Sequence, residues 1–109
     1  MTTALITGAR GFIARHLAPV LRQAGVRVVG TSRQARTVPG FDAIHPAALG
    51  DSLAPFLPAE PVDAVIHTAL DNRPHSYATN VEGTRRWLVE AQAAGAQTRQ
   101  AYQARRRTD

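Results

Sequence analysis

The chain has 109 residues, 44% of them hydrophobic and 19% charged, which allows one globular core and excludes two independent domains. Its net charge is +5, and all 13 cationic residues are arginine. The absence of cysteine excludes disulfides, thiolate nucleophiles and Cys-based metal sites, and the absence of lysine excludes a Schiff base or a Walker-type phosphate site.

The first predicted elements are a strand, a helix and a second strand. Residues 4–7 form a short apolar strand that stops at Gly8, and residues 26–31 form the second strand. The helix between them is predicted to end at Gly25. Its expected core face consists of Ile13, Leu17, Val20, Leu21 and Ala24.

The second half of the chain repeats this alternation. A weak strand at 41–45 and a short helix at 52–57 precede a nearly continuous apolar strand at 62–69. The longest helical pattern covers 77–95. Its expected core stripe consists of Val81, Thr84, Leu88, Ala91 and Gly95, with Trp87 also expected in the core. The alternation predicts an α/β fold, a doubly wound parallel sheet with strand order 3-2-1-4 and the fourth strand as an open edge.

The strongest functional signal is the turn Thr-Gly-Ala-Arg-Gly-Phe-Ile-Ala at residues 7–14. Gly8 allows a sharp turn off the strand, and Gly11 leaves room for a pyrophosphate to approach the backbone. The free N–H groups of the first helical turn then face the anion. Ala14 is the third small residue, where the helix packs on the strand. The alternative is a plain strand-to-helix turn that needs small residues.

Three motifs in order resemble the extended short-chain dehydrogenase/reductase family, also described as the NAD-dependent epimerase/dehydratase family. They are residues 7–17, residues 62–69 (Val-Asp-Ala-Val-Ile-His-Thr-Ala) and residues 80–84 (Asn-Val-Glu-Gly-Thr). The resemblance extends over residues 1–95, with Ala14 where the family commonly has glycine. The resemblance implies a Rossmann-type sheet, here the N-terminal half with about four strands, that binds NAD or NADP.

The loop after the second strand bears on the choice of cofactor. Ser32 and Arg33 stand where NAD-preferring relatives carry an acidic residue. A carboxylate there would bind the ribose 2′-hydroxyl, whereas a cation would pair with a 2′-phosphate. The resemblance therefore favours NADP over NAD, with Arg33 as the main 2′-phosphate ligand and Arg10 as a second candidate.

The resemblance also implies cofactor contacts in two later motifs. The backbone after the fourth strand is expected below the ribose and nicotinamide, and Asn80 near the active site. His67 is expected to be structural, and the adenine-side residue stays open between Asp51 and His45. The expected cofactor-binding residues are Gly8, Arg10, Gly11, Phe12, Ile13, Ser32, Arg33, Thr68, Ala69, Leu70 and Asn80.

The catalytic motif of the family is missing from the 109 residues of this sequence. The family uses a tyrosine with a lysine four residues later, but Tyr77 is followed by Val81 and Tyr102 by Arg106. No catalytic residue is expected, and the four histidines show no metal-ligand spacing. We expect a catalytically incomplete NAD(P)-binding segment of an epimerase, dehydratase or reductase; the alternative is a non-catalytic NADP sensor.

Residues 96–109 form a basic tail with four arginines and one aspartate, which is +3 of the net charge of +5. We expect a boundary at residue 95, a tail that is disordered or frame-shifted rather than family sequence, and no buried parallel strand within it. Without the tail the net charge is ordinary, so no nucleic-acid partner is expected.

No apolar run reaches the roughly 18 residues of a membrane span, and no signal peptide is evident, so a cytoplasmic protein is expected. Substrate and oligomeric state stay open.

Overall fold

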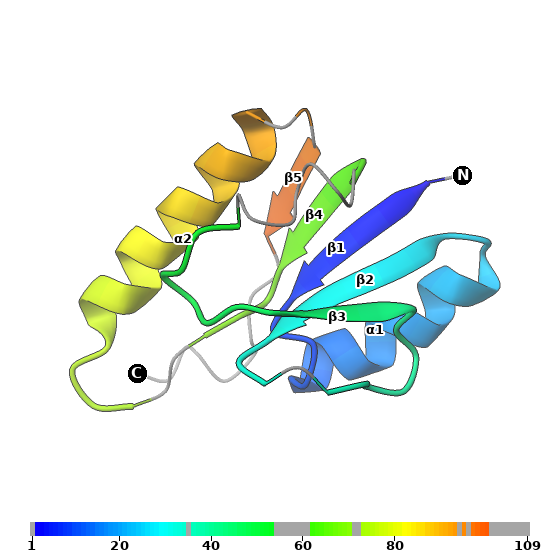
Figure 1. Ribbon diagram of the computed structural model, residues 1–109, viewed down its shortest axis with the longest axis horizontal. Coiled ribbons are helices and arrows are strands. Elements are labelled where there is room, and N and C mark those ends of the chain that lie inside the picture. Colours follow the sequence, from blue (N-terminus) through cyan, green and yellow to red (C-terminus); the bar gives the residue numbers. More distant parts are fainter. Residues whose placement is uncertain are drawn as a thin grey trace.

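Strands and helices alternate along the chain (Figure 1). The computed structural model describes residues 2–34, 36–53, 62–70, 73–93 and 95, and the backbone of 97–100. The elements are β1 (Thr3–Thr7), α1 (Phe12–Gln23), β2 (Arg27–Ser32), β3 (Ala43–Pro46), β4 (Ala64–His67), α2 (Tyr77–Ala93) and β5 (Gln97–Gln100).

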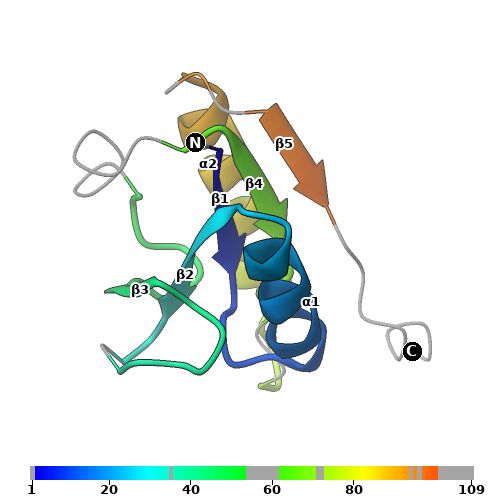
Figure 2. The ribbon, with the colours of Figure 1, turned by 90° about the vertical axis from the view of Figure 1, so that its right-hand side faces the viewer.

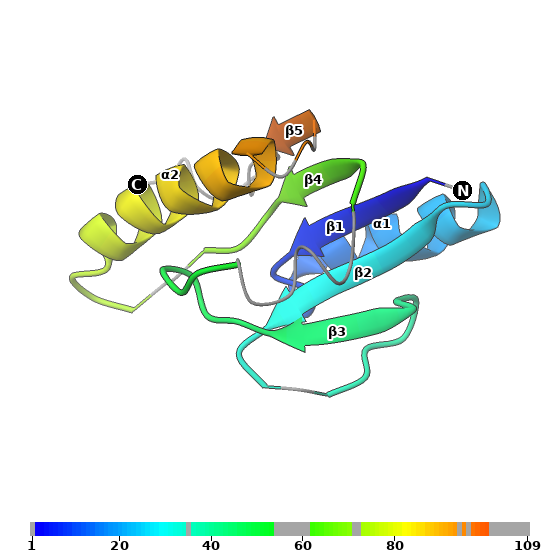
Figure 3. The same ribbon diagram turned by 45° about the horizontal axis from the view of Figure 1, so that its top comes forward.

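One parallel sheet runs through the molecule with the strand order β3-β2-β1-β4-β5, which can be followed in Figure 3. Leu5 of β1 lies opposite Val29 of β2 on one side and Val65 of β4 on the other. The predicted order 3-2-1-4 is confirmed. Because the order reverses next to β1, the connections after β1 and β4 diverge at the carboxyl edge, which is where ligands bind in open α/β sheets.

The two helices cover opposite faces of the sheet (Figures 1 and 2). Successive residues of a strand point to opposite faces, so neighbouring residues such as Leu5 and Ile6 enter different cores. The core under α1 consists of Ile6, Ala14, Ala18 and Val28. The core under α2 consists of Leu5, Val29, Ala47, Leu53, Val65, Trp87 and Ala91.

The buried face of α1 differs from the predicted one. Ala14 and Ala18 are completely buried, whereas Val20, expected in the core, is 61% exposed. The small alanines let the helix axis approach the sheet closely, which rotates the larger apolar residues to the sides of the contact. The predicted end is confirmed, since Gly25 follows the helix with a φ of +87°.

The buried face of α2 also differs from the expected stripe. Gly83, Trp87 and Ala91 are buried, and Val81, expected in the core, is 42% exposed. The prediction that Trp87 belongs to the core is confirmed, since only 1% of it is exposed. One large indole between two small residues fills the space beneath the helix, and this arrangement displaces the predicted stripe.

The prediction that β4 is an open edge is wrong, because β5 pairs with it in parallel, with Ile66 opposite Arg99. Ladder hydrogen bonds join backbone groups, so a polar segment can form a strand where one neighbour offers an unpaired edge. Residues 101–109 lie outside the described residues. So does most of the short helix predicted at 52–57, of which Ser52 and Leu53 are described and are not helical.

Candidate functional site

A cleft of about 680 Å³ opens at the carboxyl ends of β1, β2 and β4. The turn after β1, the loop after β2 and the segment after β4 supply its walls, joined by residues 47–49 after β3. Nine of the eleven residues predicted for cofactor binding line it: Gly8, Arg10, Gly11, Phe12, Ser32, Arg33, Thr68, Ala69 and Leu70. The fold thus brings three distant segments together around one space.

The turn after β1 is tight, and its geometry depends on glycine. Gly8 has a φ of +74°, and a Cβ on it would lie 2.8 Å from Cα of Ala69. The N–H of Gly11 donates to the Gly8 carbonyl at 2.9 Å, and the N–H of Ala9 donates to the Thr31 carbonyl at 2.8 Å. An L-residue at position 8 would be strained in its backbone and would also collide with the opposite wall.

The N-terminus of α1 adjoins the same turn. Gly11 is its N-cap, with extended backbone and no side-chain cap, and the first helical turn carries no acidic residue. The first helical hydrogen bond runs from Arg15 N to the Gly11 carbonyl, so the N–H groups before it have no acceptor within the helix. Such an end carries partial positive charge and stabilises an anion.

The loop after β2 places cations on the rim of the cleft. Thr31, near the end of β2, is buried, and its hydroxyl accepts the N–H of Gly8 at 3.1 Å, which joins the end of this strand to the glycine turn. Arg33 and Arg10 are exposed and line the cleft. Within the described part of the chain, neither guanidinium takes part in an ion pair. Their charge is therefore available to a ligand in the cleft.

The wall after β4 is attached to β1 through side chains. The Thr68 hydroxyl donates to the Thr7 carbonyl at 2.6 Å. The N–H groups of Thr68 and Ala69 both donate to the Thr7 hydroxyl, at 3.0 and 3.2 Å. The predicted strand at 62–69 consequently ends at His67, since the last two residues turn out of the ladder to form this wall.

His67 lies next to this wall but is not among the residues that line the cleft. Its Nδ1 is 2.8 Å from the Thr7 hydroxyl, and its Nε2 is 2.8 Å from the hydroxyl of Thr84 in α2. His67 as a whole is 3% exposed, and its ring meets Trp87 edge to face, with 5.8 Å between ring centroids. Burial lowers the pKa of His67 from 6.5 to about 4, so the ring is neutral at neutral pH.

The cleft lining lacks two predicted residues, Ile13 and Asn80. Asn80 lies in the first turn of α2, where its N–H donates to the Ser76 carbonyl at 2.9 Å. Neither candidate for the adenine side lines the cleft, and the carboxylate of Asp51 instead accepts the N–H of Ala48 at 2.9 Å. The binding roles of all eleven residues stay predictions.

Several residues that line the cleft were not predicted from the sequence. Residues 47–49 follow β3, so their position at the carboxyl end of a parallel strand was a usable signal. Arg73 and Gln34 also line the cleft, but each stands in a loop with no motif around it.

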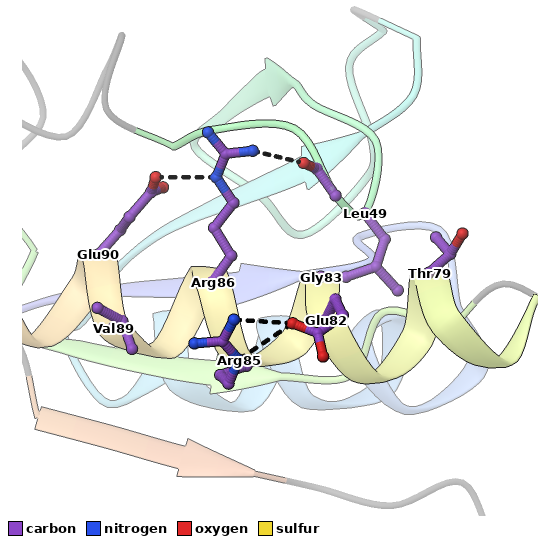
Figure 4. Close-up of a pocket in the computed structure, with 9 residues that line it drawn as sticks. Leu49, Thr79, Glu82, Gly83, Arg85, Arg86, Val89 and Glu90 are labelled. Carbon is purple, nitrogen blue, oxygen red and sulfur yellow. Dashed lines mark hydrogen bonds and ion pairs between the residues drawn. The ribbon is translucent and has the colours of Figure 1, made fainter.

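A second hollow, of about 540 Å³, lies between α2 and residues 49–50 (Figure 4). Arg85 pairs with Glu82 at 2.8 Å and Arg86 with Glu90 at 3.2 Å, so the charged groups of this hollow neutralise one another. Partial burial acts to raise the pKa of Glu90, but hydrogen bonds from Leu53 N, Ser52 and Arg86 outweigh it and lower the pKa. These contacts hold a loop against α2, whereas in the cleft Arg10 and Arg33 have no ion pair among the described residues.

Two kinds of feature were not found within the described ranges. Those ranges contain no group of three metal-binding side chains arranged to hold an ion. They also contain no helix that is long and apolar enough to cross a membrane.

A family model described as the NAD dependent epimerase/dehydratase family matches residues 4–105 of the chain. The match extends beyond residue 95, and the predicted boundary there stays a prediction. A comparison with curated proteins found no match.

Solved structures have the same fold. A short-chain dehydrogenase/reductase superfamily protein from Agrobacterium tumefaciens with bound NAD has 31% identity and a TM-score of 0.69, over 92% of this chain and 31% of that chain. UDP-glucose-4-epimerase from Stenotrophomonas maltophila, with bound NAD and formylated UDP-arabinopyranose, has 24% identity and a TM-score of 0.73, over 94% and 36%. The enzyme WbmH from Bordetella bronchiseptica, in complex with NAD+, has 23% identity and a TM-score of 0.70, over 88% and 37%. The last two show the fold alone, and the chain spans about a third of the length of all three.

Proposed function

Because the chain belongs to the NAD-dependent epimerase/dehydratase family, we propose that it binds a nicotinamide dinucleotide in the cleft at the carboxyl ends of β1, β2 and β4. The observation that carries the proposal is the glycine turn against an uncapped helix N-terminus. Gly8 and Gly11 keep side chains out of the space where a pyrophosphate approaches the backbone, and α1 presents unpaired N–H groups there. The residues present fit the ligand.

We propose further that NADP is preferred over NAD. Arg33 and Arg10 stand on the rim of the cleft with no ion pair among the described residues, and Ser32 occupies the place where a carboxylate would bind a 2′-hydroxyl. A 2′-phosphate would supply the negative charge that these guanidinium groups lack. The solved relatives named above hold NAD, so the preference rests on the arginines of this chain alone.

The activity we propose for the whole protein is that of an epimerase, dehydratase or reductase. When bound, a nicotinamide cofactor supplies or accepts the hydride in such reactions. The 109 residues contain no lysine, and therefore no Tyr-x-x-x-Lys pair, so we assign this segment to cofactor binding and not to proton transfer. The same observation supports the alternative, a dinucleotide sensor, which would bind the cofactor without any turnover.

Calorimetric titration with NADPH and NADH tests the proposal. Wild-type chain is expected to bind NADPH about tenfold more tightly than NADH, because one charge-assisted hydrogen bond is worth about that factor. Arg33→Ala should remove this preference and leave NADH affinity unchanged. Arg15→Ala is the matched control, since Arg15 is also an exposed cation but lies outside the cleft lining. Folded protein that binds neither dinucleotide would refute the proposal, and Arg33→Ala with unchanged NADPH affinity would refute the preference.

A further inference from the structure

The hydroxyl of Thr7 is the meeting point of three nitrogen atoms. Nδ1 of His67 lies 2.8 Å from it, the backbone nitrogen of Thr68 3.0 Å and the backbone nitrogen of Ala69 3.2 Å. Thr7 is completely buried, so no solvent competes for these bonds. The parallel pairing of β1 with β4, which puts Thr7 opposite His67, brings all four groups together.

Counting hydrogens assigns a direction to each bond. Two of the three partners are backbone N–H groups, which can only donate, and they use both lone pairs of the Thr7 oxygen. The single hydrogen of the hydroxyl is therefore left for Nδ1 of His67, and this nitrogen must be unprotonated to accept it. The arrangement admits one tautomer of the neutral ring, with its hydrogen on Nε2.

The other side of the ring agrees with this assignment. Nε2 lies 2.8 Å from the hydroxyl of Thr84, which can accept its hydrogen. A doubly protonated ring would turn a donor against the Thr7 hydroxyl and leave that hydroxyl without an acceptor. Burial lowers the pKa of His67 to about 4, and so keeps the ring neutral at neutral pH.

The position of the cleft wall depends on these bonds. The N–H groups of Thr68 and Ala69 begin the segment that lines the cleft after β4. Across from it, Gly8 approaches so closely that a Cβ there would lie 2.8 Å from Cα of Ala69. A small displacement of Ala69 therefore changes the separation of the two walls.

We propose that His67 is a positioning residue for the cleft. Its bare Nδ1 holds the Thr7 hydroxyl in the rotation that leaves both oxygen lone pairs for Thr68 and Ala69, and this sets the distance between the segment 68–70 and the Gly8 turn. The inference rests on the proposed function in that the cleft is taken to hold a dinucleotide. His67 acts on the ligand through Thr7 and the backbone, without touching it.

Two substitutions test the hydrogen bonds of Nδ1 and Nε2 of His67 separately. In His67→Asn the side-chain oxygen takes the place of Nδ1 and can still accept from Thr7. In His67→Gln the side-chain N–H takes the place of Nε2, so the contact with Thr84 is kept and the acceptor for Thr7 is lost. Both variants lose the ring contact with Trp87, so this loss is common to the pair.

The readouts are NADPH affinity and amide hydrogen exchange. We expect His67→Gln to bind NADPH about tenfold more weakly than His67→Asn, because one directed hydrogen bond is worth about that factor. Exchange of the Thr68 and Ala69 amides should be faster in His67→Gln and close to wild type in His67→Asn. Equal affinity and equal exchange in the two variants would reduce His67 to a packing residue and overturn the proposal.

Nitrogen NMR of the imidazole in the wild-type chain supplies a measurement that needs neither a variant nor a ligand. A bare Nδ1 and a protonated Nε2 support the proposal, and a hydrogen on Nδ1 overturns it. If the wild-type chain binds no dinucleotide, the proposed function fails. The tautomer and the exchange rates still decide whether His67 positions the wall.

Discussion

The two walls of the cleft are held in place by different kinds of interaction. The turn after β1 is fixed by backbone bonds, from Ala9 N to the Thr31 carbonyl and from Gly11 N to the Gly8 carbonyl. The wall after β4 is fixed by side chains, chiefly the hydroxyl of Thr7 and the ring of His67. The first wall therefore depends on which backbone conformations are sterically allowed, and the second depends on protonation and hydrogen-bond direction.

The largest loss of stability is expected from Gly8→Ala, which disrupts the turn after β1. The new Cβ would combine left-handed strain at a φ of +74° with a contact of 2.8 Å to Ala69 Cα. Strain of about 1–2 kcal/mol and overpacking of about 1–3 kcal/mol should together lower the free energy of unfolding by about 4 kcal/mol. Urea denaturation of wild type and variant measures this difference in the free energy of unfolding.

Gly25→Ala is the matched control for that substitution. Gly25 has a φ of +87°, but nothing lies within 4 Å of a Cβ built on it, so only the strain of about 1–2 kcal/mol should appear. If both variants lost the same stability, the close approach of the two walls would carry no cost, and the steric account of the first wall would be wrong.

The wall after β4 is held by side chains, so its contribution to stability should depend on pH. The pKa of His67 is about 4 in the folded protein and 6.5 when unfolded, so the unfolded chain takes up the proton first as the pH falls. The stability that this group contributes is complete above about pH 6.5 and is lost progressively down to about pH 4. Since one pKa unit is worth about 1.4 kcal/mol, the loss is about 3 kcal/mol.

His67→Asn isolates this contribution, because the variant has no group titrating there. The stability difference between wild type and variant, from denaturation at several pH values, should shrink as the pH falls through this window. The lowered pKa of Glu90 acts at lower pH, where carboxylates protonate, and is common to both proteins. Parallel stability curves for the two proteins would show that His67 is not buried as a neutral ring.

A smaller effect is expected from Thr7→Val, which keeps the shape of the side chain and removes its hydroxyl. The N–H groups of Thr68 and Ala69 then lose their common acceptor inside the protein. Leaving buried groups unpaired should lower the free energy of unfolding by about 2 kcal/mol. Thr7→Ser retains the hydroxyl and should restore the exchange protection of both amides. Equal exchange in the two variants would place the anchor of this wall elsewhere.

The turn after β1 could be predicted from the sequence better than the wall after β4, and the reason is physical. The glycine at position 8 is needed by one local backbone conformation, so the turn between β1 and α1 could be read from adjacent residues. The hydrogen-bonded chain from Thr7 through His67 to Thr84 joins residues 60 and 17 positions apart. The parallel pairing of β1 with β4 brings Thr7 to His67, the packing of α2 against β4 brings Thr84 to the same ring, and no local pattern specifies either contact.

The misses in secondary structure have a similar origin. β5 is a polar segment at residues 97–100, and what makes it a strand is the unpaired edge of β4. The core face of α2 was assigned by apolar spacing through Val81, but Gly83 is the residue against the neighbouring loop. A Cβ on Gly83 would lie 2.9 Å from the Gly50 nitrogen, so close approach selects that face.

Trp87 gives the molecule an intrinsic optical probe. It is the chain's single tryptophan, it lines the cleft, and its indole forms an edge-to-face contact with His67. Its N–H donates to the Asp51 carbonyl, so the same ring also reports on the loop that α2 holds. Tryptophan emission from this protein therefore comes from one known place, and unfolding, dinucleotide addition and His67 titration can each be followed there without a label.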